Sequence, residues 1–434
     1  MSIEKNENHS KNKVAIIGAG FSGLTLARYL VLSGIACEIF EASDRSGGMI
    51  KTERKDGFLI ESAANAILAS NEVEKLFSEL SIPFEKAGFK SNSRYIFRNK
   101  PKLLPFNIFE LIFIFFKVIK SLILRNIKPT QQESLSDWAV RVGGEKFKNY
   151  LLEPAIGGVY AAKTNQLSAF LVLAGFFYAG FKTQKGKLKG SLSPTNGMQA
   201  IIDALVVFLK SKSVKIHYNS KVQVASLKHD FNFIVVASSL KDLKEIVNDE
   251  SFNLSNDFDK TLRLDISTVT ILPDQEKTIK GFGCLFPRTE NFKALGVLFN
   301  TDIFANRGIK SSETWILPFV SNDSEVVKHA ILNDRSRLHT CQTNFEVLKL
   351  QTWPNSLPAY NNELLTFLNS SNFKNNKLEF TLPVFEQGAR LAYPQNFVYV
   401  TGNYLGGIGL AKILDYNLRL SNKIKKDLYE SSYS

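Results

Sequence analysis

Short apolar runs alternate with longer amphipathic stretches at the start of the chain. Residues 14–17 are continuously apolar, which predicts a short buried strand. After a glycine-rich turn, residues 22–32 carry the apolar spacing of a helix, and a second apolar run over 36–40 ends at Glu41. A strand, a helix and a strand in this order form the unit from which a parallel α/β sheet is built.

The same patterns predict elements further along the chain. Residues 106–128 predict a helix and 262–350 a mixed region of strands. The other expected elements are a strand beginning at 57, a helix over 71–80, a hairpin over 93–105, a strand-turn-helix over 188–209, strands at 214–227 and 231–240, and a strand, glycine-rich loop and helix over 397–424. Several of these strands are expected to return to the first sheet, so that sheet is built from separated segments.

The turn after the first strand has glycines in the spacing GxGxxG. Gly18 makes the tight turn, Gly20 lets the backbone approach a pyrophosphate, and Gly23 lets helix and strand pack closely. The helix from about Ser22 directs its N-terminal amide groups at the phosphates, and Phe21 and Ser22 are expected to contact the cofactor. Glu41 follows eighteen residues after Gly23, where its carboxylate can accept hydrogen bonds from both hydroxyls of an adenine ribose. A carboxylate at this position would repel the 2′-phosphate of NADP, so NADP is disfavoured as the cofactor.

Residues 41–48, EASDRSGG, distinguish NAD from FAD. After Glu41 and Ala42 they add Arg45 and the pair Gly47-Gly48, which a simple nicotinamide dehydrogenase does not need. This extension resembles the FAD-binding fingerprint of the flavin-containing amine oxidoreductase superfamily. The resemblance implies extended FAD with Arg45 close to it. No cysteine lies near the C-terminal glycine-rich loop, so we expect the FAD to be non-covalent.

The expected fold is α/β, with a doubly wound Rossmann-like FAD domain and other domains inserted between its segments. The chain of 434 residues has room for two or three domains. The predicted bounds are 11–62, 188–240 and 385–430 for the FAD-binding domain, 63–94 and 241–384 for a mixed α+β substrate domain, and 95–187 for a helical membrane-binding region.

The composition of the chain limits the kinds of binding partner that we expect. The net charge of +13 favours an anionic lipid or a polycarboxylate substrate, while the lack of a dense basic tract argues against nucleic acid. The three cysteines are isolated, as in a reduced intracellular protein, and the five histidines form no ligand-spaced pair, so no metal is expected. Residues 1–13 lack the apolar core of a signal peptide, which predicts a cytoplasmic protein.

Residues 106–128 are the most apolar part of the chain. Their longest charge-free stretch, Leu111–Phe116, is too short to span a bilayer. Their polar positions form a cationic stripe beside a face of Phe, Ile and Leu, which predicts a helix lying in the membrane interface and ended by Pro129. The alternative is a core helix under a loop. A second apolar run, Phe170–Phe181, with the basic stretch 182–189, either extends that membrane face or is core followed by a solvated loop.

Four further segments resemble the protoporphyrinogen oxidases, the oxygen-dependent flavoenzymes of haem synthesis. They are 134–169, 281–307, 352–360 and 400–410. The resemblance implies that a hydride leaves a methylene bridge of a porphyrinogen for the flavin, and that O2 then reoxidises the flavin and yields H2O2. Protoporphyrinogen and coproporphyrinogen both remain open as the substrate.

The resemblance also implies site residues. Arg94 falls on the arginine that pairs with a substrate propionate, and a guanidinium suits a carboxylate. Asn65 falls on an active-site asparagine, Gly158 on a glycine that faces the substrate ring, and Leu285 and Phe304 on apolar walls. The implied FAD contacts beyond the first motif are Val222, Gly402, Asn403, Gly409 and Leu410. No acid–base dyad is evident.

The chain departs from that family at Ala63-Ala64, at Ala162-Lys163 and after Gly409. Two other functions therefore stay open. One is another membrane-associated flavin oxidoreductase, such as a carotenoid desaturase or an amine oxidase. The other is an FAD-binding membrane scaffold without turnover. The expected partners are a porphyrinogen, O2 and the inner face of the cell membrane, and a second copy of the chain or the next enzyme of the haem pathway is left open.

Overall fold

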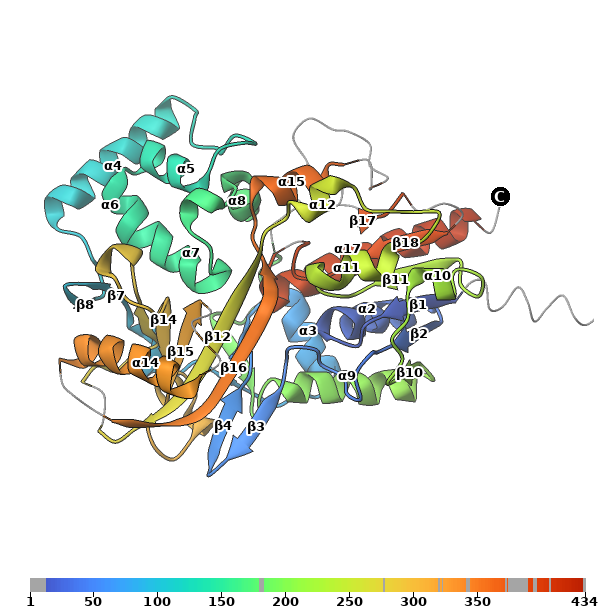
Figure 1. The fold of residues 1–434 in the computed structure, drawn as a ribbon, viewed down its shortest axis with the longest axis horizontal. Helices are drawn as coiled ribbons and strands as arrows, with labels where there is room; N and C mark the ends of the chain where they lie inside the picture. The colour runs from blue at the N-terminus through green and yellow to red at the C-terminus, as the bar shows by residue number, and fades with distance from the viewer. Residues whose placement is uncertain are drawn as a thin grey trace, which may run out of the picture.

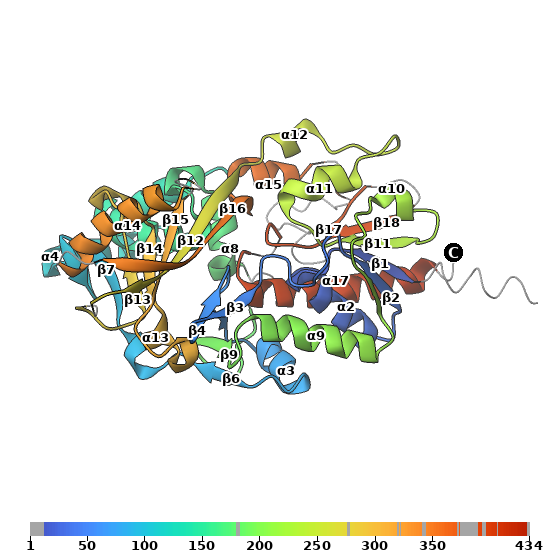
Figure 2. The same ribbon diagram turned by 60° about the horizontal axis from the view of Figure 1, so that its bottom comes forward.

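The chain folds into two lobes that lie side by side (Figures 1 and 2). The computed structural model describes residues 13–178, 183–275, 278–318, 321, 323–340, 344–370, 373, 389–392, 396–405 and 407–431. One lobe is organised by a six-stranded sheet and the other by a seven-stranded sheet. Cys341, residues 179–181 of the second apolar run and residue 182 of the basic stretch lie outside the described residues.

The six-stranded sheet has the order β10-β2-β1-β11-β18-β17. Its strands are β1 (Val14–Ile17), β2 (Cys37–Phe40), β10 (Lys215–His217), β11 (Phe233–Val236), β18 (Phe397–Val400) and β17 (Ala389–Arg390). All neighbours pair in parallel except β17 with β18. The predicted α/β fold with a parallel sheet assembled from distant segments is confirmed, whereas the predicted bounds of the three domains stay a prediction.

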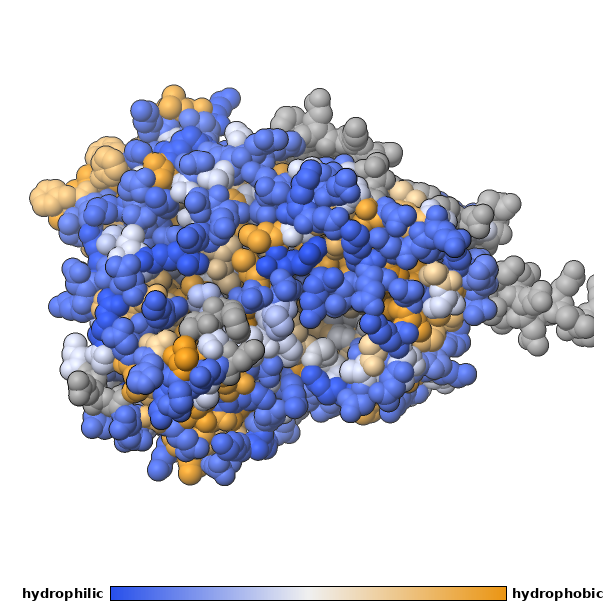
Figure 3. Space-filling model, in the orientation of Figure 1, coloured by the Kyte–Doolittle hydropathy of each residue, from blue (hydrophilic) through white to orange (hydrophobic). Residues whose placement is uncertain are grey.

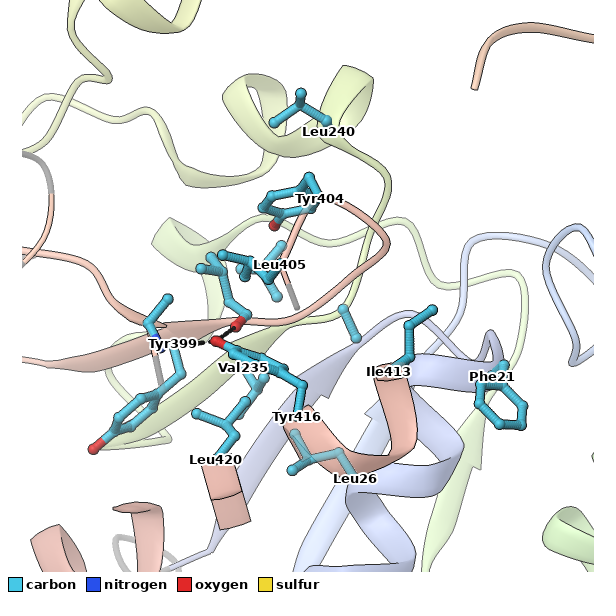
Figure 4. Close-up of a cluster of buried hydrophobic side chains, with 14 of the residues drawn as sticks. Phe21, Leu26, Val235, Leu240, Tyr399, Tyr404, Leu405, Ile413, Tyr416 and Leu420 are labelled. Carbon is cyan, nitrogen blue, oxygen red and sulfur yellow. Dashed lines mark hydrogen bonds between the residues drawn. The ribbon is translucent and has the colours of Figure 1, made fainter. Parts of the chain in front are cut away.

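Two helices begin at the carboxyl edge of this sheet and run parallel to each other. They are α2 (Phe21–Leu32), which follows β1, and α17 (Leu410–Ser431), which follows β18. The Asn417 side chain of α17 donates to Ser22 O at 2.8 Å and to Thr25 Oγ1 at 2.7 Å. Figure 4 shows the buried apolar side chains of these helices, including Ile413 and Tyr416, together with those of the neighbouring strands. The two helix N-termini therefore face the same edge.

Most predicted elements between the sheet strands form as expected. They are β4 (Phe58–Glu61), α3 (Asn71–Glu79), β7 (Arg94–Arg98), β8 (Lys100–Lys102), β9 (Ser191–Pro194) and α9 (Gln199–Ser211). Three short strands were not predicted, namely β3 (Thr52–Lys55), β5 (Ile67–Leu68) and β6 (Phe84–Lys86). The predicted strand over 214–227 was wrong beyond His217, because α10 (Val224–Leu227) ends that segment. The strand stops where Ser220 N donates to Glu41 O and the chain crosses the sheet edge. The run over 231–240 likewise leaves β11 and begins α11 (Leu240–Val247).

The seven-stranded sheet has the order β16-β12-β15-β14-β13-β7-β8. Its remaining strands are β12 (Arg263–Pro273), β13 (Gly283–Leu285), β14 (Gly296–Phe299), β15 (Glu313–Pro318) and β16 (Phe345–Pro358). One face, with Val269, Trp315 and Cys284, is buried in a cluster that includes Val327 and Ile331 of α14 (Ser324–His339). The short helix α13 (Asn300–Ile303) follows β14, whereas α12 (Asn256–Asp259) and α15 (Asn362–Leu368) pack against each other and bury Phe258 and Phe367 in the core cluster of the other lobe. The opposite face of the seven-stranded sheet borders the candidate substrate site.

A helical region follows β8 along the chain. In Figure 1 its helices lie above the seven-stranded sheet. It contains α4 (Ile108–Ile123), α5 (Leu135–Val142), α6 (Glu145–Phe147), α7 (Glu153–Tyr160) and α8 (Ala169–Phe177). Residues 169–174 of α8 are buried, so the core alternative holds for this part of the second apolar run. Among the described residues no helix is long and apolar enough to cross a membrane.

Part of the polar stripe of α4 faces the protein, whereas Lys120, Arg125 and Lys128 are exposed. Arg98 donates to both carboxylate oxygens of Glu110 at 2.6 and 2.8 Å, and Lys117 Nζ donates to Val140 O at 2.9 Å. The interpretation of these polar residues as a stripe for lipid headgroups is therefore corrected at Glu110 and Lys117, because intramolecular partners bind them. The helix also ends at Ile123, well before Pro129.

The apolar face of α4 points outward. Phe109, Phe113 and Phe116 are 78%, 57% and 64% exposed, although phenylalanine is usually buried. Figure 3 shows hydrophobic side chains at the end of the molecule where Figure 1 places α4. The alternative of a core helix is therefore wrong, because the apolar face is uncovered.

Candidate flavin and substrate site

Of the three glycines in the first turn, only Gly20 has room for a side chain beside it. A Cβ on Gly18 (φ +108°) would lie 2.6 Å from Ala237 O, and one on Gly23 would lie 2.0 Å from Gly18 O. Packing within the protein therefore requires both glycines. A Cβ on Gly20 would meet nothing closer than Gly48 Cα at 4.0 Å, and the φ of Gly20 is an ordinary −73°. The protein itself does not require Gly20, so this space fits the predicted pyrophosphate.

A second glycine turn lies against the first. Gly47 N donates to Ala19 O at 2.9 Å, and Gly47 and Gly48 have φ of +119° and +59°, which glycine adopts without strain. The Arg45 guanidinium donates to the carbonyls of Ser46, Gly48 and Ile50 at 3.2, 2.7 and 3.2 Å. Arg45 thus holds the shape of the second turn, next to the space beside Gly20.

Glu41 sits at the end of β2 with both oxygens oriented. Its Oε2 accepts from Ala19 N at 2.7 Å, and its Oε1 accepts from Ser43 N and Oγ at 2.9 and 2.7 Å. Carboxylate oxygens have further lone pairs, so ribose hydroxyls can still be accepted. Ala42 is exposed beside it, and the chain carrying Val222 passes here because Ser220 N donates to Glu41 O at 2.8 Å.

The C-terminal loop after β18 lies at the same sheet edge. A Cβ on Gly402 would lie 2.9 Å from Ser238 O, whereas one on Gly409 would meet nothing within 4 Å. Asn403 donates its Nδ2 to Ser356 O at 3.2 Å, but its buried Oδ1 has no partner among the residues that the structure describes. An unpartnered buried acceptor in the loop that leads to α17 fits a donor on a bound group. The residues present therefore fit FAD.

The free face of the seven-stranded sheet meets α7 and the C-terminal loop. Leu285 pairs with Ile96 and Gly296, and paired residues project to the same face of the sheet. A Cβ on Gly158 would lie 3.1 Å from Leu285 Cδ2, so α7 approaches Leu285 closely there. The half-buried residues that complete this apolar face are Ile266, Ile316 and Ile408, which pack with Ala161, Leu295 and Leu357.

Arg94 begins β7 on the same face. It is exposed, and its guanidinium carbon lies 4.2 Å from the centre of the Phe282 ring. In the part of the chain that the structure describes, no carboxylate pairs with Arg94. The structure thus brings Arg94, Leu285 and Gly158 to one surface, with an uncompensated cation at its edge.

Asn65 and Phe304 are joined through a residue that the sequence analysis missed. Asn65 is half-buried and Phe304 is buried. Arg307 donates to Asn65 O at 2.8 Å and to Glu61 at 2.6 Å, and its guanidinium carbon lies 5.3 Å from the centre of the Phe304 ring. No local pattern distinguishes a buried arginine from a solvated one. The roles of Asn65 and Phe304 toward a substrate stay predictions.

Comparison with known proteins identifies the family. The model of the flavin containing amine oxidoreductases matches residues 21–246, just over half of the 434 residues. The chain belongs to this family. The predicted FAD cofactor is thereby confirmed, while its non-covalent attachment and the individual contact residues stay predictions.

The family's members that resemble this chain over most of its length include porphyrinogen oxidases. Protoporphyrinogen oxidase 2 of Arabidopsis thaliana is 25% identical, over 93% of this chain and 92% of that protein. Coproporphyrinogen III oxidase of Staphylococcus aureus is 26% identical, over 80% of this chain and 88% of that protein. The solved structure of an oxidoreductase from Methanosarcina mazei has a TM-score of 0.67 at 17% identity, over 95% of this chain and all of that chain, which shows a shared fold. The predicted resemblance to protoporphyrinogen oxidases is confirmed.

Proposed function

We propose that this flavoprotein oxidises a porphyrinogen to the porphyrin, with O2 as final acceptor and H2O2 as product. The observation that carries the proposal is the half-buried apolar face around Leu285 and Ile316, with the unpaired Arg94 at its edge and the flavin-side residue Ile408 beside it. A porphyrinogen has matching chemistry, because its ring system is apolar and its carboxylates lie at the rim. The names of the relatives support the same substrate class.

Each predicted site residue has a role in this proposal. Arg94 binds a propionate, for which a guanidinium fork is well suited. Leu285 and Phe304 hold the ring, and Gly158 faces it from α7, where a larger side chain would meet Leu285. Asn65 lies at the flavin side, held through its carbonyl by Arg307. FAD, when bound, supplies the acceptor for the hydride that leaves a methylene bridge.

We further propose that the outward apolar face of α4 rests in the interface of the cytoplasmic membrane leaflet. Three of its phenylalanines are more than half exposed, and burying such a side chain contributes about 1.5–3 kcal/mol. The polar side of α4 is bound to the protein through Arg98 and Val140. Attachment would therefore depend mainly on the apolar face, and detergent should release the protein better than salt.

The decisive experiment adds protoporphyrinogen IX or coproporphyrinogen III to the purified, FAD-loaded protein in air. Porphyrin fluorescence should appear with at least one of them, with H2O2 released in parallel. The faster of the two reactions shows whether the site prefers the porphyrinogen with two carboxylates or the one with four. Protein that holds FAD but oxidises neither porphyrinogen would refute the proposal. Peroxide release with amines would then favour an amine oxidase, and no turnover at all would favour the scaffold.

A further inference from the structure

Lys412 is a cation in an unusual position. It is the third residue of α17, and its Nζ lies 3.3 Å from the place that a Cβ on Gly407 would occupy. The side chain therefore runs back past the start of the helix, in the direction that helical side chains usually take. This brings the ammonium to the C-terminal loop at the carboxyl edge of the sheet.

The surroundings of Lys412 disfavour a positive charge. The N-terminus of a helix carries partial positive charge, so a cation there is repelled. Burial lowers the pKa of Lys412, and no charged neighbour contributes to that shift. In the described part of the chain, no carboxylate pairs with its ammonium. A half-buried cation without a counter-ion at a helix N-terminus would be relieved by a bound anion.

The stagger of α17 against α2 indicates which part of FAD this anion belongs to. The contact of Asn417 with Ser22 O sets the two parallel helices in register. Asn417 is seven residues into α17, whereas its two partners on α2, Ser22 and Thr25, are one and four residues into that helix. At 1.5 Å per residue, α17 therefore projects about 5–9 Å further. The pyrophosphate belongs at the start of α2. The start of α17 therefore lies about 5–9 Å beyond the pyrophosphate, on the side where the ribityl chain leads to the flavin ring.

We propose that the Lys412 ammonium lies beside the pyrimidine edge of the flavin ring and stabilises the negative charge that the ring carries when reduced. The proposal rests on the flavin cofactor alone and does not require a porphyrinogen as substrate. The pyrophosphate is the other anion of FAD, and the stagger of the helices places it nearer Gly20 than Lys412. The two anions differ in one testable respect, since only the flavin ring changes its charge on reduction.

The test compares FAD bound to the parent, Lys412→Met, Lys412→Arg and Lys426→Met. Lys426 lies at the far end of α17, and its side chain is 70% exposed, so it is a matched control. The readouts are the midpoint potential of the flavin, by dye equilibration, and the dissociation constant of its sulfite adduct, which also places negative charge on the ring. No substrate is needed, so the outcome is independent of the proposed function.

We expect Lys412→Met to weaken sulfite binding about tenfold and to lower the potential by about 30 mV, the equivalent of tenfold for a two-electron couple. Lys412→Arg and Lys426→Met should stay within about twofold of the parent. An unchanged potential and sulfite affinity in Lys412→Met would overturn the proposal. So would a weaker FAD affinity at unchanged potential, which would assign Lys412 to the pyrophosphate.

A variant that fails to hold FAD does not prevent the test. In the parent, the ammonium loses its proton as the pH rises through its lowered pKa, whereas the arginine of Lys412→Arg stays charged. The potential of the parent should therefore fall below that of Lys412→Arg as the pH is raised. Parallel pH profiles of the two proteins would overturn the proposal without any neutral variant.

Discussion

Replacing Arg307 with methionine tests how the predicted substrate contacts are held. Arg307 is 2% exposed and donates to Glu61 at 2.6 Å, to Asn65 O at 2.8 Å and to Ser193 Oγ at 2.7 Å. Methionine keeps much of the volume but removes the charge and every donor. Glu61, itself 4% exposed, would keep only Met198 N and Thr52 Oγ1 as partners.

The expected loss of stability in Arg307→Met arises because the Glu61 carboxylate stays buried without its cation. Removing one partner of a buried ion pair costs about 3–5 kcal/mol, because the remaining charge is desolvated without compensation. Removing both charges, in Glu61→Gln with Arg307→Met, should cost less, since no buried charge is left behind. The expected order of stability is therefore the parent, then the double variant, then Arg307→Met.

Denaturant unfolding of the FAD-loaded proteins, followed by flavin release, measures this order. The KM for a porphyrinogen should rise in Arg307→Met more than FAD affinity falls, because Asn65 and the Phe304 ring both lose their support. Arg307→Lys keeps the charge and should recover part of the stability. A Arg307→Met protein within about 1 kcal/mol of the parent, or a double variant no more stable than the single one, would refute the reasoning.

Four further predictions concern separate parts of the molecule. Gly20→Val should fold like the parent but bind no FAD, because its side chain meets the cofactor space and not the protein; retained flavin absorbance would contradict this. Arg94→Ala should lower kcat/KM for a porphyrinogen about ten- to a hundredfold at unchanged FAD content, with Arg94→Lys intermediate, and equal rates at low substrate would refute the propionate contact. Burial raises the pKa of Asp334 to about 6 although Lys293 N and Ala294 N donate to it, so the fold loses stability as the pH rises from about 4 to about 6. Asp334→Asn should therefore be about 2–3 kcal/mol more stable than the parent at pH 8 and equal to it below pH 4, measured by denaturant unfolding at both values. Phe113→Ser with Phe116→Ser should weaken binding to anionic vesicles at least about tenfold in a sedimentation assay, with FAD content unchanged as the control.

Local backbone geometry made the cofactor half of the site readable from the sequence. Gly18 and Gly47 adopt positive φ that glycine alone takes easily, and Gly23 lies too close to Gly18 O for any side chain. The strand, helix and strand around them follow from apolar spacing within about 30 residues. Such features depend on neighbours in the chain, so the motif sufficed to predict β1, α2, β2 and the position of Glu41.

Long-range contacts decided what the sequence alone left open or misassigned. Arg307 and Glu61 are 246 residues apart, and Asn417 and Ser22 are 395 apart, so no local pattern could pair them. The same holds for α4, whose amphipathic spacing was clear but whose orientation was not. Glu110 and Lys117 turn inward because Arg98 and Val140 supply partners for them, whereas Lys120 stays exposed. Periodicity determines which residues share a face, but only packing against distant segments determines what that face meets.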